Sequence, residues 1–264
     1  MVGKALKQED NIDYLITIAQ PHPIHWGAEK YITNNKEKIK LWIADCGDPF
    51  MGNPFVKKPL YFKSIEKKWC KACNYISVPI EEAVNAYYPE FKDKIKIIPQ
   101  GFDFSGVKLV EYRTNDIPTF AYSGIFYKDL RDPTLFLKYL SSLDFDFKFI
   151  VYTKSISFFK QYKEILKDKL EIRDYIPRDE LLFELSKMDF LINIKNSSGV
   201  QQPSKIIDYA ITKRPIIELS SEFKEQNVFE EFLKSNYLNR YNVESIEKYN
   251  IENVTNSFLN LYNK

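Results

Sequence analysis

The stretch DFLINIKNSSGVQQPSKIIDYAITKRPIIEL, Asp189 to Leu219, decides the fold because it reads as strand, loop, helix and strand. Its two ends are short apolar runs, as expected for strands of a parallel sheet that is covered on both faces. Pro203 suits the first turn of a helix, where its missing N–H costs nothing. The stretch therefore predicts a unit whose helix begins at the carboxyl edge of a parallel sheet, where ligands of open α/β folds bind.

Three polar residues of this helix, Ser204, Lys205 and Asp208, lie within about one turn and can face one ligand. Free backbone N–H groups and the charge of Lys205 attract an anion. A carboxylate behind that anion, Asp208, can accept hydrogen bonds from ribose hydroxyls. The alternative is a solvated helix start with an ion pair between Lys205 and Asp208. The sequence of this helix alone leaves both interpretations open.

A second set of candidate residues follows TFAYS, Thr119 to Ser123, the expected first strand of the same sheet. The next loop, GIFYKDLRDP, contains Gly124, Lys128 and Arg131. Glycine lets backbone approach a phosphate closely, and a lysine and an arginine can bind a diphosphate together. Two anion-suited loops at one sheet edge favour a ligand site.

The rest of the chain repeats the alternation of short apolar runs and amphipathic segments, which predicts an α/β fold. Strands are expected at Asp13–Ile18, Lys40–Asp45, Tyr75–Pro79, Lys94–Pro99, Thr119–Ser123, Phe147–Thr153, Leu170–Ile172, Asp189–Ile194 and Pro215–Leu219. Helices are expected near Ile24–Thr33, Pro59–Cys73, Ile80–Tyr88, Pro133–Leu143, Ser157–Leu166, Arg178–Lys187 and Pro203–Thr212. We predict two Rossmann-like domains, residues 1–104 and 105–264, the second including a terminal helix that docks on one of the sheets.

The composition of the chain excludes several classes of function. The 38 basic and 36 acidic residues leave a net charge of +2, so no global field favours nucleic acid or a membrane surface. No apolar span approaches the ~20 residues of a membrane helix, and three cysteines are too few to staple the chain. Cys70 and Cys73 form a C-x-x-C without a second ligand pair, so no metal site is expected. We expect a cytoplasmic protein.

Polar residues also follow strands of the first domain. His22 and His25, in QPHPIHW, suit capping or packing as well as chemistry. Asp45 and Asp48 can orient an acceptor hydroxyl, although Asp48 before Pro49 equally forms a turn.

Taken in order, these segments resemble the GT-B glycosyltransferases, in particular glycosyltransferase family four. The resemblance rests on KIKIIPQGFDF (Lys94–Phe104), FAYSGIFYKDLRDP, IRDYIPRDELLFELSKMDFLINI (Ile172–Ile194) and PSKIIDYAITKRPII (Pro203–Ile217). It covers most of the chain from about Tyr14 onward.

The resemblance implies a nucleotide-sugar donor as substrate, with no further cofactor. Lys128 and Arg131 match the basic pair that binds the pyrophosphate, and Asp208 matches the second glutamate of an E-x7-E motif that contacts the ribose. Tyr175 and Ile176 would border the base. His25 matches a histidine at the interdomain cleft and, with Asp48, is the catalytic candidate.

The sequence departs from that pattern. Val200 stands where the first glutamate is expected, so the loop Gly199–Gln202 would contact the sugar, with Gln202 as its candidate. Relatives carry further βα units upstream, including a glycine-rich first loop. We therefore expect an incomplete first domain with an exposed sheet edge, from a shortened gene product or covered by a partner.

We therefore predict a metal-independent enzyme of polysaccharide biosynthesis that moves a hexose from a nucleoside-diphosphate sugar to an acceptor hydroxyl. Retention at the anomeric carbon is implied by the family resemblance alone. The acceptor would be a glycan or a lipid-linked glycan, which allows peripheral membrane association. The alternative is a non-catalytic, nucleotide- or partner-binding remnant of such an enzyme.

Overall fold

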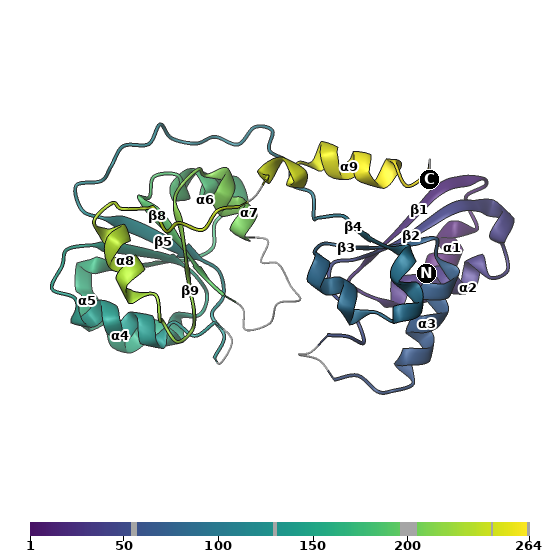
Figure 1. Cartoon of the computed structure of the whole chain (residues 1–264), viewed down its shortest axis with the longest axis horizontal. Helices are drawn as coiled ribbons and strands as arrows, with labels where there is room; N and C mark the ends of the chain where they lie inside the picture. The colour runs from purple at the N-terminus through teal and green to yellow at the C-terminus, as the bar shows by residue number, and fades with distance from the viewer. Residues whose placement is uncertain (54–56, 129–130, 196–204, 244, 263–264) are drawn as a thin grey trace. The chain divides into compact units, whose positions relative to one another are not determined.

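The computed structural model describes residues 1–53, 57–128, 131–195, 205–243 and 245–262. The chain forms two compact units (Figure 1). The first unit contains Met1–Asp103 and the chain end from Glu247 onward, and the second contains the described residues from Phe104 to Ile246.

The first unit is built on a parallel sheet of four strands in the order β1-β2-β3-β4. These strands are β1 (Ile12–Ala19), β2 (Ile39–Cys46), β3 (Tyr75–Val78) and β4 (Ile95–Ile97). The described helices of this unit are α1 (Val2–Leu6), α2 (Pro23–Ile32), α3 (Phe62–Ala72) and α9 (Ile251–Leu259). The predicted helix at Ile80–Tyr88 is instead a 3-10 segment, Glu81–Ala86, because Pro89 and the extended Tyr87 and Tyr88 end it early.

Both faces of this sheet are covered, which explains its nearly continuous apolar strands. On one face, Trp42 and Ile76 of the sheet pack with Trp69 of α3. On the other, Leu41 and Ile43 pack with α9 through Val254. The terminal helix, which the sequence analysis grouped with the second domain, thus packs on the first sheet, and Phe102 N–H donates to the Tyr249 carbonyl at 2.7 Å just before it.

Strands β1 and β4 are the two edges of this sheet among the described residues, and the incomplete first domain stays a prediction. Ile16 and Ile18 on β1 are 40% and 59% exposed.

The second unit is built on a parallel sheet of five strands in the order β7-β6-β5-β8-β9. These are β5 (Thr119–Ser123), β6 (Lys148–Tyr152), β7 (Leu170–Arg173), β8 (Phe190–Ile194) and β9 (Ile216–Leu219), close to the predicted bounds. The chain moves outward from β5 to β7 and then returns to the other side of β5 with β8. The strand order therefore reverses between β5 and β8, which is where open α/β sheets form a crevice at their carboxyl edge.

Helices cover this second sheet on both faces (Figure 1). One face carries α4 (Thr134–Ser142), α5 (Lys160–Leu166) and α8 (Gln226–Leu233), and the other carries α6 (Arg178–Leu185) and α7 (Lys205–Ile211). The aromatic rings of Phe120, Phe149 and Phe190 stack across the first face at centroid distances of 4.8–5.1 Å. The sequence analysis missed α8. None of the described helices is long and apolar enough to cross a membrane.

A buried carboxylate fixes the start of this second sheet. Asp189, just before β8, is 2% exposed. Its Oδ1 accepts from the Tyr112 hydroxyl at 2.6 Å and from Asn115 N–H at 3.1 Å. Its Oδ2 accepts from Thr119 N–H at 2.7 Å and from the Asn115 side-chain amide at 3.1 Å. One residue thereby ties the segment before β5 to the amino end of β8, so the two strands that flank the crevice are held in register.

Asp189→Ala should lower the free energy of unfolding of the second unit by about 3 kcal/mol or more, because it leaves several buried donors without an acceptor. Urea unfolding followed by circular dichroism measures the change. Asp146→Ala is the matched control: Asp146 is 83% exposed in its ion pair with Lys169, and its loss should cost less than about 1 kcal/mol. Equal effects of the two substitutions would contradict the proposed role of Asp189.

Candidate functional site

The candidate site lies at the carboxyl edge of the second sheet, in the loop that follows β5 and at the start of α7, the helix that comes after β8. Directly after β5, Gly124 has a φ of +141°, and a Cβ there would approach the Tyr122 hydroxyl oxygen at 3.2 Å. Only glycine takes this backbone conformation readily. Gly124 N–H donates to the Tyr152 carbonyl at 3.0 Å, so the first residue of the loop remains attached to β6.

The loop after Gly124 turns back on itself and returns Arg131 to the sheet edge. Tyr127 and Arg131 form an antiparallel bridge, in which Arg131 N–H donates to the Tyr127 carbonyl at 2.9 Å. The guanidinium lies 5.3 Å from the centre of the Tyr127 ring. Burial raises the pKa of Tyr122 to about 12, and the charge of the neighbouring Arg131 acts in the opposite direction. Arg131 therefore lies beside Tyr122, at the end of β5.

Helix α7 is fixed to the same point of the sheet. Ser123 N–H donates to the Tyr209 hydroxyl at 2.7 Å, which joins the middle of α7 to the end of β5. Lys205, one helical turn earlier, lies on the same side of the helix. Its Nζ is 4.0 Å from the centre of the Tyr122 ring. The helix after β8 and the loop after β5 thus bring two cations, Lys205 and Arg131, to one tyrosine.

These two cations lack an anionic partner among the described residues. Lys205 Nζ and Arg131 Nε are both buried without a hydrogen-bond partner there. Burial, and next the charge of Arg131, lower the pKa of Lys205 well below its usual range. A buried ammonium beside a guanidinium is electrostatically unfavourable unless an anion is bound. The arrangement is therefore suited to a ligand that carries more than one negative charge.

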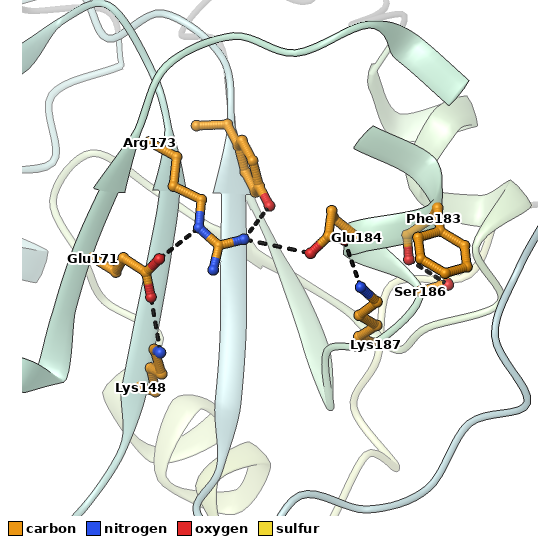
Figure 2. A network of polar contacts seen from close by, with 8 residues as sticks. Lys148, Glu171, Arg173, Phe183, Glu184, Ser186 and Lys187 are labelled. Carbon is orange, nitrogen blue, oxygen red and sulfur yellow. Dashed lines mark hydrogen bonds and ion pairs between the residues drawn. The ribbon is translucent and has the colours of Figure 1, made fainter. Parts of the chain in front are cut away.

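A neighbouring arginine shows what a fully partnered cation looks like in this unit (Figure 2). Arg173, at the end of β7, donates to Glu171 at 2.7 Å and to the Tyr152 hydroxyl at 2.7 Å, and contacts Glu184 at 3.4 Å. Glu171 in turn pairs with Lys148. The hydrogen bond to Glu171 raises the pKa of Arg173. This network joins β6 and β7 to α6 and so fixes the helix that carries Arg178.

Asp208 is paired with Arg178, the first residue of α6. Its Oδ1 accepts from Arg178 Nε at 2.9 Å and lies 2.8 Å from Nη2. Burial raises the pKa of Asp208, while Arg178 acts in the opposite direction. The alternative of a Lys205–Asp208 ion pair is therefore wrong: the carboxylate is directed to α6 and the ammonium to Tyr122. Asp208 is oriented one turn behind the two cations, and contact with a ribose stays a prediction.

The remaining predicted donor-site residues are placed as follows. Tyr175 and Ile176 lie in the loop between β7 and α6, and the Tyr175 ring is 40% exposed beside Lys154. Lys128 is exposed, and in the described part of the chain no contact joins it to Arg131. Gln202 and Ser204 lie outside the described residues. Lys205 accompanies Arg131 beside Tyr122, and a role of Lys128 in binding a pyrophosphate stays a prediction.

In the first unit, His25 is a core residue. Its ring is 0% exposed and lies 4.7 Å from the Trp69 ring. Trp42 Nε1 donates to the Thr17 hydroxyl at 2.9 Å, which lies 2.7 Å from His25 Nδ1. The hydroxyl that accepts from Trp42 can donate its own proton to Nδ1, which leaves Nε2 protonated toward Cys46 Sγ at 3.4 Å. This packing does not support the catalytic role that the resemblance implies, because both ring nitrogens are occupied.

Polar residues do meet at the carboxyl edge of the first sheet. The Ser77 hydroxyl on β3 donates to Asp45 Oδ1 on β2 at 2.6 Å, and burial raises the pKa of Asp45. Gln20 Nε2 lies 3.4 Å from Asp48 Oδ2. A catalytic role for Asp48 stays a prediction. Within the described ranges no group of three or more His, Cys, Asp or Glu side chains could hold a metal ion.

Three residues that shape the candidate site were not predicted from the sequence: Tyr122, Tyr209 and Arg178. Tyr122 and Tyr209 look like core residues because they lie in apolar runs, and only the structure shows their contacts with Lys205 and Ser123. Arg178 had a usable signal, since it begins the predicted helix next to the expected base-binding loop.

Comparison with known proteins identifies the fold. No family model and no curated protein matches the sequence. A glycosyltransferase from Rickettsia africae superimposes with a TM-score of 0.66 at 14% identity, covering 99% of this chain and 78% of that one. HepE of Anabaena, in complex with UDP and glucose, gives 0.69 at 8%, covering 100% and 81%. A UDP-N-acetylglucosamine 2-epimerase gives 0.54 at 8%, covering 99% and 76%.

These likenesses confirm the predicted GT-B type of α/β fold with Rossmann-like units. Identities this low establish the fold alone, and the likeness to family four in particular stays a prediction. The epimerase shows that the same fold serves more than one reaction on sugar nucleotides.

The environment of His25 predicts how stability depends on pH. Burial lowers the pKa of His25 to about 3 in the folded chain, whereas the unfolded value is near 6.5. Between these values the unfolded chain binds the extra proton, so stability falls as pH falls below about 6.5, by up to about 1.4 kcal/mol per pH unit. Urea unfolding of the wild type from pH 7 to pH 4 measures the slope.

His25→Gln should flatten this slope, and the sugar transfer that the resemblance implies should stay within a few fold of the wild type after correction for the folded fraction. A catalytic role would be indicated instead by a loss of turnover in folded enzyme with the pH slope unchanged.

Proposed function

We propose that the protein is a glycosyltransferase that binds a nucleoside-diphosphate sugar at the carboxyl edge of the second sheet and transfers the sugar to an acceptor hydroxyl. The observation that carries this proposal is the pair of buried cations, Lys205 and Arg131, beside Tyr122. A diphosphate supplies the charge that this pair lacks. The fold shared with glycosyltransferases supports the reaction class.

The same pair would also promote the chemistry. When the bond between the anomeric carbon and the diphosphate breaks, negative charge accumulates on the leaving oxygen. Two cations already in place stabilise that charge without reorganisation, in a site with little water. Gly124 leaves room for the diphosphate to approach the backbone, and Asp208, oriented by Arg178, would bind the ribose. Tyr175 offers an exposed ring for the base.

The finer assignments follow the same logic. Two fixed cations can supply the charge stabilisation that a divalent metal supplies elsewhere, so we propose a metal-independent enzyme. A hexose donor, retention at the anomeric carbon and a glycan or lipid-linked acceptor follow from the family resemblance. Transfer should therefore persist in EDTA.

Arg131→Gln should lower kcat/KM for the donor by about 30- to 1000-fold, which corresponds to the loss of one preorganised donor, about 2–4 kcal/mol. Binding of UDP, GDP and ADP by calorimetry, and product formation from the matching hexose donors, measure the two parts. Lys138→Gln removes an exposed charge of the same unit on α4 and is the matched control.

Nucleotide binding without transfer, hydrolysis or epimerisation by the wild type would favour the non-catalytic remnant. Unchanged nucleotide affinity in both Arg131→Gln and Lys205→Met would exclude this site as the donor site. Epimerisation of the sugar nucleotide in place of transfer would assign the chain to the other reaction that this fold serves.

Lys205 provides a prediction of a different kind, since its burial without an anion is unfavourable. Lys205→Met should raise the free energy of unfolding of the ligand-free chain by about 1–2 kcal/mol while weakening diphosphate binding. In the wild type, a bound diphosphate raises the lowered pKa of Lys205, so binding takes up a proton wherever Lys205 is neutral in the free chain.

The affinity for UDP should consequently fall with rising pH even above about pH 7.5, beyond the phosphate's own ionisation near pH 6. Titrations in buffers of different ionisation enthalpy measure the proton uptake. It should disappear in Lys205→Met and persist in Lys138→Gln. Proton release on binding, or uptake unaffected by Lys205→Met, would contradict this account of the site.

A further inference from the structure

A basic segment of the first unit has no role in the proposed donor site. Residues Lys57 to Lys71, KKPLYFKSIEKKWCK, contain six lysines and one glutamate. They lie between β2 and α3 and continue through most of that helix, and Figure 1 shows the segment looping out before α3 begins.

Most lysines of this segment form no ion pair among the described residues, although Lys58 Nζ lies 4.6 Å from the centre of the Phe50 ring and Lys63 Nζ lies 5.8 Å from that of Tyr88. Lys67 pairs with Glu90, but within the described ranges Lys57, Lys58 and Lys63 form no ion pair. The single glutamate of the segment, Glu66, is 1% exposed and accepts from the Tyr88 hydroxyl at 2.6 Å. Burial raises the pKa of Glu66 and the charge of Lys58 acts in the opposite direction, so this carboxylate offsets part of the charge of Lys58 and leaves that of Lys57 and Lys63.

An apolar tip protrudes among these lysines. Leu60 is 84% exposed and Tyr61 is 62% exposed, in a molecule whose other large apolar side chains are mostly buried. We define the tip surface as Lys57, Lys58, Leu60, Tyr61 and Lys63.

The tip surface is held by ordered structure. Lys63 N–H donates to the Leu60 carbonyl at 3.0 Å, and Ser64 N–H and hydroxyl donate to the Tyr61 carbonyl at 3.2 and 2.7 Å. Beneath the tip, the Phe62 ring stacks on Trp26 at 5.4 Å and meets Phe50 edge-on at 5.4 Å. The tip thus stands on an aromatic base and begins a helix, so its exposure is a built feature.

We propose that the tip surface docks on an anionic lipid bilayer, with Leu60 and Tyr61 entering the interfacial layer and Lys57, Lys58 and Lys63 facing the headgroups. An aliphatic side chain and a tyrosine ringed by lysines match the chemistry of that layer, where apolar burial and attraction to anionic lipid act together. A polyanion dissolved in water would use the lysines and leave Leu60 in solvent. The proposal concerns the first unit and does not depend on the donor site of the second.

Flotation of the full chain with vesicles tests the proposal. The wild type should float with vesicles of phosphatidylcholine and phosphatidylglycerol, should not float with phosphatidylcholine alone, and should be released by high salt. Replacing Lys57, Lys58 and Lys63 by Gln should weaken partitioning by on the order of 100-fold. Leu60→Ser combined with Tyr61→Ser should weaken it by at least about tenfold with no change of charge.

The matched control replaces Lys138, Lys160 and Lys163 by Gln, which removes the same charge from exposed positions of the second unit and should leave flotation unchanged. Circular dichroism and urea unfolding of every variant confirm that both units are folded. The proposal is overturned if the Leu60/Tyr61 variant floats like the wild type, if the control loses flotation equally, or if the wild type binds soluble polyphosphate but no vesicle.

Discussion

The second unit holds two positive charges close together in a buried site. The described residues supply no negative charge to balance them, and the rest of this unit must stabilise that arrangement. Lys205 is the first residue of α7 and Arg131 lies in the loop after β5, yet both side chains lie beside Tyr122 at the end of β5. Such a pair opposes folding unless something else holds its scaffold. That scaffold is identifiable: Asp189 fixes β5 against β8, Tyr209 fixes α7 to Ser123, and the Tyr127–Arg131 bridge closes the loop. These hydrogen bonds stabilise the unit enough to keep Lys205 and Arg131 in place without an anionic partner.

The contrast between Arg131 and Arg173 strengthens this interpretation. Both lie at the carboxyl edge of one sheet, Arg131 in the loop after β5 and Arg173 at the end of β7, so lying at this edge does not by itself distinguish them. Arg173, at the outer strand β7, is neutralised by Glu171 and held by Tyr152. Arg131, at the point where the strand order reverses, has a second cation where Arg173 has a carboxylate. A folding constraint alone would favour the arrangement around Arg173 at both places. The reversal point is also where the fold opens to a ligand, so the unbalanced charge is found where a ligand can balance it.

The sequence predicts the strands well because each βα unit repeats the same local signal: a short β-branched or aromatic run, a turn, and an amphipathic helix. Nearly all strand bounds agree with the structure to within a residue or two. Two helices were predicted wrongly. The segment near Ala83 is a 3-10 helix because Pro89 and the extended Tyr87 and Tyr88 end it early, whereas α8 was overlooked although Phe229, Phe232 and Leu233 stand at helical spacing. The site was predictable in part. The sequence predicts Arg131 and Lys205 as site residues because both follow strands of the second sheet. It does not predict their contact partners, because these depend on side-chain directions that sequence spacing does not fix. Lys205 and Asp208 are spaced to form an ion pair along their helix. In the structure, Asp208 instead pairs with Arg178, and the Lys205 ammonium lies over the Tyr122 ring. For His25, family position and physical environment disagree, and a fully buried ring with both nitrogens bonded is better explained as part of the core.

The two units also differ in how they expose charge, and this difference bears on function more directly than the fold does. The same fold accompanies glycosyltransferases and an epimerase, so the reaction is decided by what lies around the sugar nucleotide rather than by the sheets. An epimerase needs only the nucleotide, but a transferase must also collect an acceptor. The second unit buries its unbalanced cations, which suits a small, desolvated anion. The first unit instead displays its lysines around Leu60 and Tyr61, which suits an extended anionic surface that no pocket could enclose. With the two proposals taken together, the chain would draw a soluble donor to one unit and a membrane-bound acceptor to the other, and that combination would favour transfer over a reaction confined to the nucleotide.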